Sequence, residues 1–572
     1  MKVAKDYVLK LGFVFKEILK AGPGVFFLSI GSMIITGVSP VITTYLTAKL
    51  IEELGMNIGN ETSGIYFELL AILLGMLGVV VISFATEGVK TVICSVVGLK
   101  LSHNIENHIA EKFQSIKQER IDDPEFLNLH SNTLTKSGSE PLNLMEGLFG
   151  MIANLISLVG YAGIIIKLNL WAFLIIMVFT LPIIVYKRKY QGMLFRFFNE
   201  RTMQMRRIWY YLSLITDPQY CKEIREFRLY SYFRKRRKES FDDFMKGNSK
   251  IAAKEILVSV ITSFISMIGA ILVGVWLIKN TLTGIVSVSD FYLFVTAIIT
   301  IVTKLIALSN QIASNSKSMM FINYIFEYMQ ESNTIESKQV KITEKTIHNI
   351  RFENVSFKYI GGDYYALKDI NISFNTNETI CLVGENGSGK STFSKLLLRI
   401  YDPTKGRILL DDIDLREYDI TELRKFFGVL FQDYVLFAFS IAENILMRKI
   451  ENENDEKKVQ NALKIVGLYD KIKQLPNGIN TQVYREFDNE GCVLSGGEAQ
   501  RLAMARLLVN NYDVIILDEP CSSISLNSRR IIMGKIFDLY KNKIVFVVTH
   551  DIDWIDRKAN IFTLNKGKLE VS

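Results

Sequence analysis

The chain has 572 residues, of which 49% are hydrophobic and 22% charged, and its formal net charge at pH 7 is +8. This length argues against a single domain, and the hydrophobic share is high for a soluble protein of ordinary charge content. Five cysteines are scattered along the sequence, which argues against a disulfide framework or a zinc site. No nucleic-acid motif or aromatic-interleaved basic groove accompanies the positive charge, so nucleic-acid binding is the weaker reading of it.

The first part of the chain is dominated by long apolar segments. A basic amphipathic stretch, residues 1–20, comes first and lacks the small-residue cleavage site of a secretory signal. Six later segments are apolar over the roughly 20 helical residues that cross a bilayer core about 30 Å thick. They are Gly24–Leu46, Tyr66–Ala85, Leu148–Ile166, Leu170–Tyr186, Ile256–Ile278 and Phe291–Ser309. We therefore expect six transmembrane helices, with a tight hairpin at Lys167–Asn169.

Basic residues are distributed unevenly between the predicted loops. Eighteen Lys and Arg residues fall within Lys187–Lys254, whereas the loop Ile51–Gly64 has none. The other two predicted outer loops contribute only Lys167 and Lys279. Because loops rich in Lys and Arg stay preferentially in the cytoplasm, both termini and the long loops are predicted to be cytoplasmic.

The two long cytoplasmic loops read as helices rather than as disordered segments. Apolar and charged residues alternate at helical spacing over Leu101–Ile116 and Leu194–Leu214. Each loop contains an Asp-Pro step, ending at Pro124 or Pro218, which favours a turn followed by a helix start. We predict short transverse helices there, at the tips of helices that extend well beyond the membrane, where a soluble partner domain could dock.

The character of the sequence changes after the last apolar segment. Residues 330–349 are polar and lack an apolar period, so we predict a linker there, behind a transmembrane domain of residues 1–329. From residue 350 to residue 572, short β-rich runs alternate with helical ones, and Ile380–Val383, Val514–Leu517 and Ile544–Val548 read as buried strands. This alternation predicts a cytoplasmic α/β domain with a mostly parallel sheet.

The run from Gly384 to Ser391 fits the phosphate-loop pattern G-x-x-x-x-G-K-[ST], between a predicted strand and the predicted helix Phe393–Ile400. In such a loop the backbone N–H groups face the phosphates, and the helix N-terminus adds a favourable dipole. Lys390 would reach the β- and γ-phosphates of ATP, and the Ser391 hydroxyl would bind Mg²⁺. The alternative is a glycine-rich turn capped by serine, which the strand–loop–helix context disfavours.

Two adjacent carboxylates follow the strand Val514–Leu517. A carboxylate at the end of an apolar strand has little structural purpose, so we predict that Asp518 is a magnesium partner. Glu519 is suited to act as general base on the attacking water. The alternative for Glu519 is a first-turn carboxylate stabilised by a helix dipole.

These residues resemble the ATP-binding cassette (ABC) family, and the match extends from Ile350 to the C-terminus. The run Leu494–Glu498, Leu-Ser-Gly-Gly-Glu, is similar to the signature of that family and is far more specific than the phosphate loop. The resemblance implies a head-to-tail dimer, in which Ser495 and Gly497 of one subunit touch the γ-phosphate of ATP held by Lys390 of the other. A helix N-terminus is a suitable anion site; the alternative is a flexible Ser-Gly-Gly hinge.

The resemblance also assigns roles to single positions. Gln432 corresponds to the residue that senses magnesium, His550 to the histidine that contacts the γ-phosphate, and Tyr359 to the aromatic that stacks on adenine. Tyr364 and Tyr365 compete with Tyr359 for this role. The implied catalytic residues are Glu519, His550 and Gln432, and the implied metal ligands are Ser391, Gln432 and Asp518. The implied nucleotide-binding residues are Tyr359, Gly384, Glu385, Asn386, Gly387, Ser388, Gly389, Lys390, Ser391, Thr392, Ser495, Gly496, Gly497 and Glu498.

The sequence departs from the family pattern at two positions. Ser525 stands where the family usually has the Asp that couples the two ATP sites across the dimer, which puts the coupling between the sites and the rate in doubt. The carboxylates of the ATP site are intact, so hydrolysis is expected to survive. Glu498 stands where Gln is common, a frequent and tolerated variation.

A membrane domain followed by an ATPase domain on one chain resembles exporter-type half-transporters. This resemblance implies ATP and Mg²⁺ as cofactors, and a second copy or a homologous half-transporter as partner. It also implies alternating access in the plasma (inner) membrane, among membrane lipid, with both termini and the ATPase domain in the cytoplasm. The runs Leu430–Tyr434 and Phe439–Ile445 look more like exporters of bacteriocin-type peptides than like multidrug or lipid exporters.

Three functional readings stay open: an exporter of a small peptide or amphipathic compound, a lipid or multidrug pump, and a weakly hydrolysing subunit of a heterodimer. Lys304 lies deep in the sixth predicted span. One expectation is that it faces a water-filled cavity or a partner carboxylate and contacts an anionic or polar cargo. The alternative is that its side chain snorkels to the inner interface. Glu87 and Lys90 are one helical turn apart and are expected to form an ion pair at the cytoplasmic edge.

Overall fold

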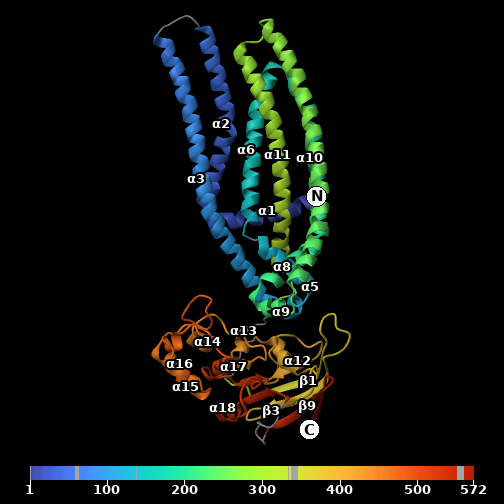
Figure 1. The fold of residues 1–572 in the computed structure, drawn as a ribbon, viewed down its shortest axis with the longest axis vertical. Helices are drawn as coiled ribbons and strands as arrows, with labels where there is room; N and C mark the ends of the chain where they lie inside the picture. Colours follow the sequence, from blue (N-terminus) through green and yellow to red (C-terminus); the bar gives the residue numbers. More distant parts are fainter. Residues whose placement is uncertain are drawn as a thin grey trace. The chain divides into compact units, whose positions relative to one another are not determined.

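The computed structural model describes residues 2–57, 63–136, 138–332, 334–335, 346–550 and 559–571. The chain divides into two compact units, shown as a ribbon in Figure 1. The helical unit comprises Met1–Gln114 and Asn128–Glu331, and the ATPase unit comprises Ser115–Leu127 and Ser332–Ser572. Most of the predicted linker, residues 330–349, lies outside the described residues.

The helical unit is built from long helices. They are α1 (Lys2–Ala21), α2 (Pro23–Met56), α3 (Ser63–Ser115), α6 (Glu140–Leu168), α7 (Leu170–Glu200), α10 (Tyr230–Leu282) and α11 (Val288–Met329). Among the described residues, six helices are long and apolar enough to cross a membrane, and they contain the six predicted spans. Helices α3 and α10 each have 53 residues, or about 80 Å at 1.5 Å per residue. Both therefore extend well beyond a bilayer core, as predicted.

Short helices form at the predicted breaks. In the first loop, α4 (Gln118–Ile121) precedes α5 (Pro124–Lys136), which begins at the proline. In the second, α8 (Thr202–Thr216) is followed by the 3₁₀ turn η1 (Pro218–Tyr220) and by α9 (Cys221–Glu226). The Asp217 carboxylate accepts a hydrogen bond of 2.9 Å from the Gln219 backbone and so caps η1. The predicted hairpin is also present, because only Asn169 separates α6 from α7.

Small residues bring α2 and α6 close together. A Cβ added at Gly160 would lie 2.8 Å from a methyl group of Val41, and one at Gly37 would lie 2.9 Å from the Ala153 carbonyl oxygen. The Ser157 hydroxyl donates a hydrogen bond of 2.6 Å to the Gly37 carbonyl oxygen. Such contacts are typical of helix packing within a membrane, where close backbone approach replaces the hydrophobic effect.

The ATPase unit contains two sheets. The four-stranded sheet has the order β2-β1-β4-β5 and is antiparallel; its strands are β1 (Asn349–Phe357), β2 (Leu367–Asn375), β4 (Lys405–Leu410) and β5 (Ile413–Asp414). The six-stranded sheet has the order β10-β9-β3-β8-β7-β6; its strands are β3 (Thr379–Val383), β6 (Phe427–Leu430), β7 (Val514–Asp518), β8 (Ile544–Val548), β9 (Asn560–Asn565) and β10 (Lys568–Val571). In the second sheet only β10 is antiparallel to its neighbour. The predicted α/β class and the three predicted buried strands are confirmed.

The described part of this unit also contains ten further helical elements. They are α12 (Lys390–Leu397), η2 (Leu415–Glu417), α13 (Ile420–Arg424), α14 (Ile441–Leu446), α15 (Glu453–Ile465), α16 (Tyr469–Lys473), η3 (Gly478–Asn480), α17 (Gly496–Ala505), η4 (Arg506–Leu508) and α18 (Leu526–Leu539). The predicted helix Phe393–Ile400 begins earlier than expected, because Lys390 and Ser391 of the phosphate loop already form its first turn.

A stack of aromatic rings fixes α12 between the two sheets. The fully buried Phe393 lies between Phe352 of β1 and Phe546 of β8, with ring centroids 4.4 Å and 5.1 Å apart. Both pairs are nearly parallel, at interplanar angles of 19° and 3°. Each buried ring contributes a large apolar area, so this stack holds the helix that follows the phosphate loop in a fixed position.

Candidate nucleotide site

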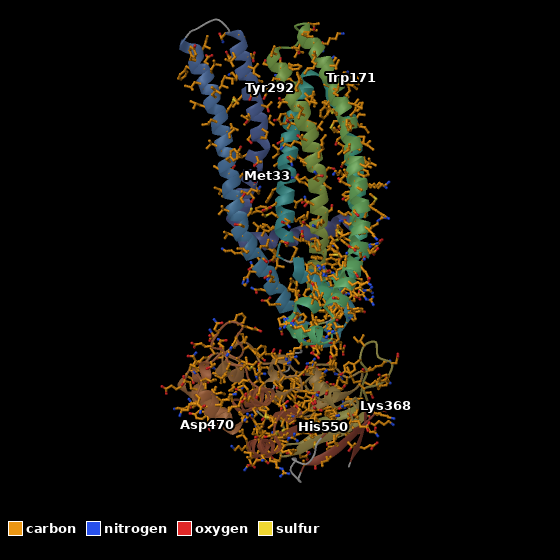
Figure 2. The ribbon with its side chains drawn as sticks, in the orientation of Figure 1. Met33, Trp171, Tyr292, Lys368, Asp470 and His550 are labelled. Carbon is orange, nitrogen blue, oxygen red and sulfur yellow. The ribbon has the colours of Figure 1, made fainter. Side chains whose placement is uncertain are left out.

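The predicted site residues gather at one edge of the six-stranded sheet. Four parallel neighbours, β3, β8, β7 and β6, end at this edge. The phosphate loop follows β3, Asp518 and Glu519 close β7, His550 follows β8, and Gln432 follows β6. His550 is labelled in Figure 2. In open α/β sheets, ligands bind beyond the carboxyl ends of the strands, so the topology places these residues where a nucleotide would lie.

The backbone of the phosphate loop depends on its glycines. Gly389 has a φ of +110°, and a Cβ there would lie 2.5 Å from the Ala366 carbonyl oxygen. A Cβ at Gly384 would lie 2.3 Å from the Leu564 carbonyl oxygen. Any side chain at these two positions would displace the neighbouring backbone, so the loop can fold in this way only with glycine there.

Lys390 is buried and lies across the inside of this loop. Its ammonium group donates hydrogen bonds to the carbonyl oxygens of Gly384, at 2.6 Å, and Glu385, at 2.9 Å. The Ser388 hydroxyl in the same loop is buried and has no hydrogen-bond partner among the described residues. The loop thus presents an ammonium group and a free hydroxyl, both of which can donate to a phosphate oxygen.

The pair Asp518 and Ser391 suits a hard cation. Asp518 is only 7% exposed, and its Oδ1 atom is buried without a hydrogen-bond partner among the described residues. Burial, and next the charge of Glu519, raise the pKa of Asp518 to about 6, against an opposing hydrogen bond from Ser391. An unpartnered carboxylate oxygen beside a hydroxyl is the kind of oxygen ligand that Mg²⁺ binds.

Glu519 lies between the two other predicted catalytic residues. Its Oε2 atom accepts a hydrogen bond of 3.3 Å from the Gln432 amide, and its Oε1 atom lies 3.5 Å from Nδ1 of His550. The Glu519 backbone has a φ of +45°, which is uncommon for a residue other than glycine. Strained conformations of this kind concentrate at functional sites.

The predicted signature residues form the N-terminus of α17. The Ser495 backbone N–H donates a hydrogen bond of 2.9 Å to the Glu498 carboxylate, whose other oxygen accepts one of 2.6 Å from Lys471. The bond from Lys471, and then that from the Ser495 backbone, lower the pKa of Glu498 to about 2. A Cβ at Gly497 would lie 2.6 Å from the Ser523 carbonyl oxygen. Among the described residues, no hydrogen bond or ion pair joins Ser495–Glu498 to the phosphate loop.

Tyr359 lies beside the first turn of α12. Its hydroxyl is 3.0 Å from the Thr392 hydroxyl, and its ring packs edge-on against Tyr401 with centroids 5.4 Å apart. Of the two competing tyrosines, Tyr364 is 83% exposed and Tyr365 is 36% exposed. The position of Tyr359 next to the phosphate loop agrees with the predicted adenine contact, which stays a prediction.

Sequence reasoning missed Gln500, which is buried in α17. Its amide donates hydrogen bonds of 3.1 Å to the Glu519 carbonyl oxygen and to the Ser522 hydroxyl, and its carbonyl oxygen accepts one of 3.0 Å from the Ser523 backbone. One side chain therefore ties the signature helix to the segment that follows Glu519. Gln500 lies two residues beyond the signature run, and no spacing rule identifies its partners.

Two predictions concern the helical unit. Glu87 and Lys90 form the expected ion pair, at 3.2 Å. For Lys304, the partner found among the described residues is an amide rather than a carboxylate: its ammonium group donates a hydrogen bond of 2.9 Å to the Asn154 side-chain oxygen. An amide oxygen satisfies one donor of the half-buried lysine without neutralising its charge.

Comparison with known proteins agrees with this geometry. The protein-family model described as "ABC transporter transmembrane region" matches residues 26–305, and the family model described as "ABC transporter" matches residues 367–522. The chain is 24% identical over 556 residues to the "Subtilin transport ATP-binding protein SpaT" of Bacillus subtilis, across 97% of this chain and 89% of that protein. It is 32% identical over 271 residues to the "ATP-dependent lipid A-core flippase" of Escherichia coli (strain K12), a match that spans 47% of this chain and 46% of that protein.

A solved structure shares the fold of nearly the whole chain. It is described as "Structure of a bacterial Atm1-family ABC exporter with ATP bound", and the likeness has a TM-score of 0.82 over 95% of each chain at 21% sequence identity. Two family models in the order membrane region then ATPase, and six apolar helices ahead of a phosphate-loop α/β domain, lead to one assignment. The chain belongs to the ABC transporter family, as an exporter-type half-transporter with a nucleotide-binding ATPase domain.

Proposed function

We propose that this chain uses ATP hydrolysis to export a small peptide or amphipathic compound across the plasma (inner) membrane, as a dimer that alternates its access. The observation that carries the proposal is the arrangement around Glu519, a strand-end carboxylate held between Gln432 and His550. A carboxylate so placed can accept a proton from the attacking water, and His550 can then donate to the γ-phosphate.

The proposed ATP site needs two subunits. Lys390 and Ser388 would bind the phosphates of ATP on one subunit, and Tyr359 would stack on its adenine. Ser495–Glu498 make no bond to the phosphate loop of their own chain among the described residues, which suits a signature helix that faces the nucleotide of the partner. Backbone N–H groups at the N-terminus of α17 would then donate to the γ-phosphate.

The proposed metal ligands are Asp518, Ser391 and Gln432. Bound Mg²⁺ would neutralise the charge that develops on the phosphate oxygens. The unpartnered Oδ1 atom of Asp518 supports this assignment. The Ser391 hydroxyl, in the first turn of α12, provides the second oxygen.

ATP binding would drive the cycle by favouring the closed dimer. To invert a 1:99 equilibrium, ATP must favour the closed state by about 5.5 kcal/mol. Several charge-assisted hydrogen bonds to the phosphates, from Lys390 and from the α17 N-terminus, are of the right strength to supply this. Hydrolysis at Glu519 would remove the γ-phosphate and release the dimer.

The peptide reading of the cargo rests on the extent of the similarities. The relative whose name states subtilin transport matches across 97% of this chain, whereas the flippase match covers 47%. A lipid pump remains the second candidate, because identity within that shorter match is higher, at 32%. The third candidate, a weakly hydrolysing subunit of a heterodimer, is left open by Ser525 in place of the usual Asp, but the intact Lys390, Glu519, Ser495 and His550 argue against it.

Transport in inside-out proteoliposomes tests the proposal. ATP-dependent uptake of an amphipathic peptide, absent from the Lys390→Ala variant, would support peptide export. Movement of a labelled lipid between leaflets without peptide uptake would favour the second candidate. If neither occurs until a second half-transporter is added, the homodimeric exporter is ruled out.

A further inference from the structure

A cavity lies within the helical unit, between α2, α3, α6 and α11. Its volume is about 390 Å³. The apolar part of its lining includes Met33, which is labelled in Figure 2, and Phe149. The polar part includes Ser83, Glu87, Lys90, Asn154 and Gln311. An apolar wall combined with a few convergent polar groups is typical of a ligand site.

A chain of hydrogen bonds fixes the amide groups on one side of this cavity. Lys304 donates to the Asn154 side-chain oxygen at 2.9 Å, and the Asn154 amide nitrogen donates to the Gln311 side-chain oxygen at 3.0 Å. Because an ammonium group can only donate, Asn154 must present its oxygen to Lys304 and its nitrogen to Gln311. Gln311 uses its side-chain oxygen in this contact. Its amide nitrogen has no hydrogen-bond partner among the described residues.

Space for the Gln311 amide is provided by Gly150. A Cβ at position 150 would lie 2.6 Å from the Gln311 amide nitrogen. Glycine at this position of α6 therefore leaves room for the Gln311 amide, and both residues line the cavity. The cavity therefore offers a preoriented hydrogen-bond donor on the side of α6 and α11.

The side formed by α3 carries an ion pair. Glu87 and Lys90 lie 3.2 Å apart, and the Glu87 side chain is 50% exposed. Neither residue forms an ion pair with any other described residue. The Ser83 hydroxyl, one turn before Glu87, is buried without a hydrogen-bond partner in the described part of the chain. Glu87 and Lys90 can exchange their contact with each other for contacts with a ligand that carries both a positive and a negative charge, and the Ser83 hydroxyl is available to the same ligand.

We propose that this cavity binds the zwitterionic end of an amphipathic cargo. An ammonium group of the cargo would lie beside Glu87, and an anionic oxygen group would accept hydrogen bonds from Lys90, Ser83 and the Gln311 amide. The inference rests on the proposed export function and specifies the substrate class of the helical unit. Two kinds of molecule share this chemistry: a peptide with free ends and a phospholipid with an ethanolamine headgroup.

The volume of the cavity sets the size of the bound group. Pockets for drug-sized ligands span roughly 300 to 1,000 Å³, so 390 Å³ holds a headgroup or one peptide end. The apolar remainder of the cargo would lie outside it. Exposed apolar side chains of α3 outside the cavity lining, such as Leu74 and Leu77, are available for that part.

The test measures binding by the full chain in nanodiscs of phosphatidylglycerol, a lipid without an ammonium group, and in the absence of ATP. Fluorescent lysophosphatidylethanolamine is compared with its N-acetyl derivative. A fluorescent apolar hexapeptide with free ends is compared with the same peptide acetylated and amidated. We expect at least one zwitterionic probe to bind about tenfold or more tightly than its capped counterpart, since hydrogen bonds to charged groups are the strong ones. The probe that does so identifies the source of the cargo.

Substitutions inside and outside the cavity test whether the zwitterionic probe binds at this site. Glu87→Gln and Gln311→Leu should each weaken binding of the zwitterionic probe about tenfold and leave the capped probe unaffected. Glu255→Gln removes a charge from another Lys–Glu pair of the same unit, that of Lys187 and Glu255, and should change nothing. Retained ATP binding shows that each variant is folded.

Equal affinity for free and capped probes, or equal effects of all three variants, would overturn the inference. Because no ATP is present, a failure of hydrolysis would leave this result intact. A failure of the proposed export function is therefore distinguishable from a failure of the binding site.

Discussion

The Tyr401 hydroxyl donates a hydrogen bond of 2.5 Å to the Asp122 carboxylate, although the two residues are 279 positions apart in the chain. The adjacent Asp402 forms an ion pair of 3.3 Å with Lys117. Lys117 and Asp122 flank α4, so both ends of this short helix are bound to Tyr401 and Asp402 within the ATPase unit. The chain continues directly from α4 into α3 and α5, which gives movements of the ATPase unit a covalent route to the long helices.

Tyr401→Phe should uncouple hydrolysis from transport. Burial, and then the bond to Asp122, raise the pKa of Tyr401, so the hydroxyl stays protonated and donates at physiological pH. Asp122 is exposed and keeps a hydrogen bond of 2.9 Å from the Gln118 amide, so removal of the Tyr401 hydroxyl costs about 0.5–1.5 kcal/mol, the net contribution of one hydrogen bond. We expect basal ATP hydrolysis within about twofold of the unmodified chain and a several-fold fall in cargo moved per ATP.

The control for this variant is Tyr418→Phe. The Tyr418 hydroxyl donates a buried hydrogen bond of 2.8 Å to the Leu410 carbonyl oxygen within the ATPase unit. Its loss should lower thermal stability without changing the number of cargo molecules moved per ATP. If both variants alter that ratio equally, the Tyr401–Asp122 bond has no specific role in coupling.

The pKa of Asp518 predicts how magnesium affinity depends on pH. With a pKa of about 6, the carboxyl group is mostly neutral at pH 5 and ionised at pH 7. A proton and Mg²⁺ compete for the same oxygens, so magnesium affinity in the presence of ATP should rise through pH 6 and level off above pH 7. Titrations with Mg²⁺ between pH 5 and pH 8 measure this rise in affinity. The Asp518→Asn variant shows how much of the pH dependence comes from protonation of the ATP phosphates rather than of Asp518. Identical pH profiles for the two proteins would contradict the assignment of Asp518 as a ligand.

The same shift has a consequence for stability without ligands. A carboxyl group whose pKa is higher in the folded than in the unfolded protein destabilises the fold as pH rises from about 4 through about 6. Unfolding of the unliganded chain should therefore show a loss of stability over that range that Asp518→Asn lacks. Added Mg²⁺ and ATP should oppose this loss.

Ser525→Asp should restore coupling between the two ATP sites. Ser525 precedes α18 as its N-cap, and its hydroxyl donates to the Ser528 hydroxyl at 3.0 Å. Asp is as good an N-cap as Ser, so the substitution keeps the helix while adding the carboxylate that the family usually has. We expect a higher Hill coefficient for ATP hydrolysis. Ser528→Asp adds a carboxylate in the same first turn and should not raise it.

Gln500→Leu should lower the rate of hydrolysis without weakening ATP binding. Leu retains the bulk but removes all three hydrogen bonds to the segment 519–523. The Glu519 backbone and the signature helix would then be free to shift, and misplacement of a catalytic group by about 1 Å can cost about a hundredfold in rate. We expect kcat to fall by at least tenfold, with the Kd of ATP within about twofold. Gln500→Glu, which keeps only the acceptor, should have an intermediate kcat.

Much of the fold could be predicted from the sequence because it follows from local patterns. Runs such as Val514–Leu517 are wholly apolar, and the resulting buried strands stand as predicted. The Asp-Pro steps likewise mark the starts of α5 and η1. The predicted helix Phe393–Ile400 differs from α12 at both ends: Lys390 and Ser391 fit the phosphate-loop pattern and yet form the first helical turn, and α12 ends at Leu397.

Contacts between distant segments could not be predicted in this way. Gln500, the Tyr401–Asp122 bond and the amide partner of Lys304 all depend on which side chains the tertiary fold brings together. A buried polar group is satisfied by whichever donor or acceptor lies within reach in the folded chain. A single sequence does not show which residues those are.

Magnesium-dependent ATP hydrolysis by this chain alone in lipid nanodiscs, measured beside Glu519→Gln, tests most directly whether Glu519 is the catalytic base. The substitution keeps the size of the side chain and its bond to Gln432 while removing the base. We predict steady hydrolysis by the unmodified chain and a fall of at least a hundredfold in the variant, with ATP binding retained. Absence of hydrolysis in both proteins despite bound ATP, or equal hydrolysis in both, would contradict the account of Glu519 as the catalytic base of a self-sufficient exporter.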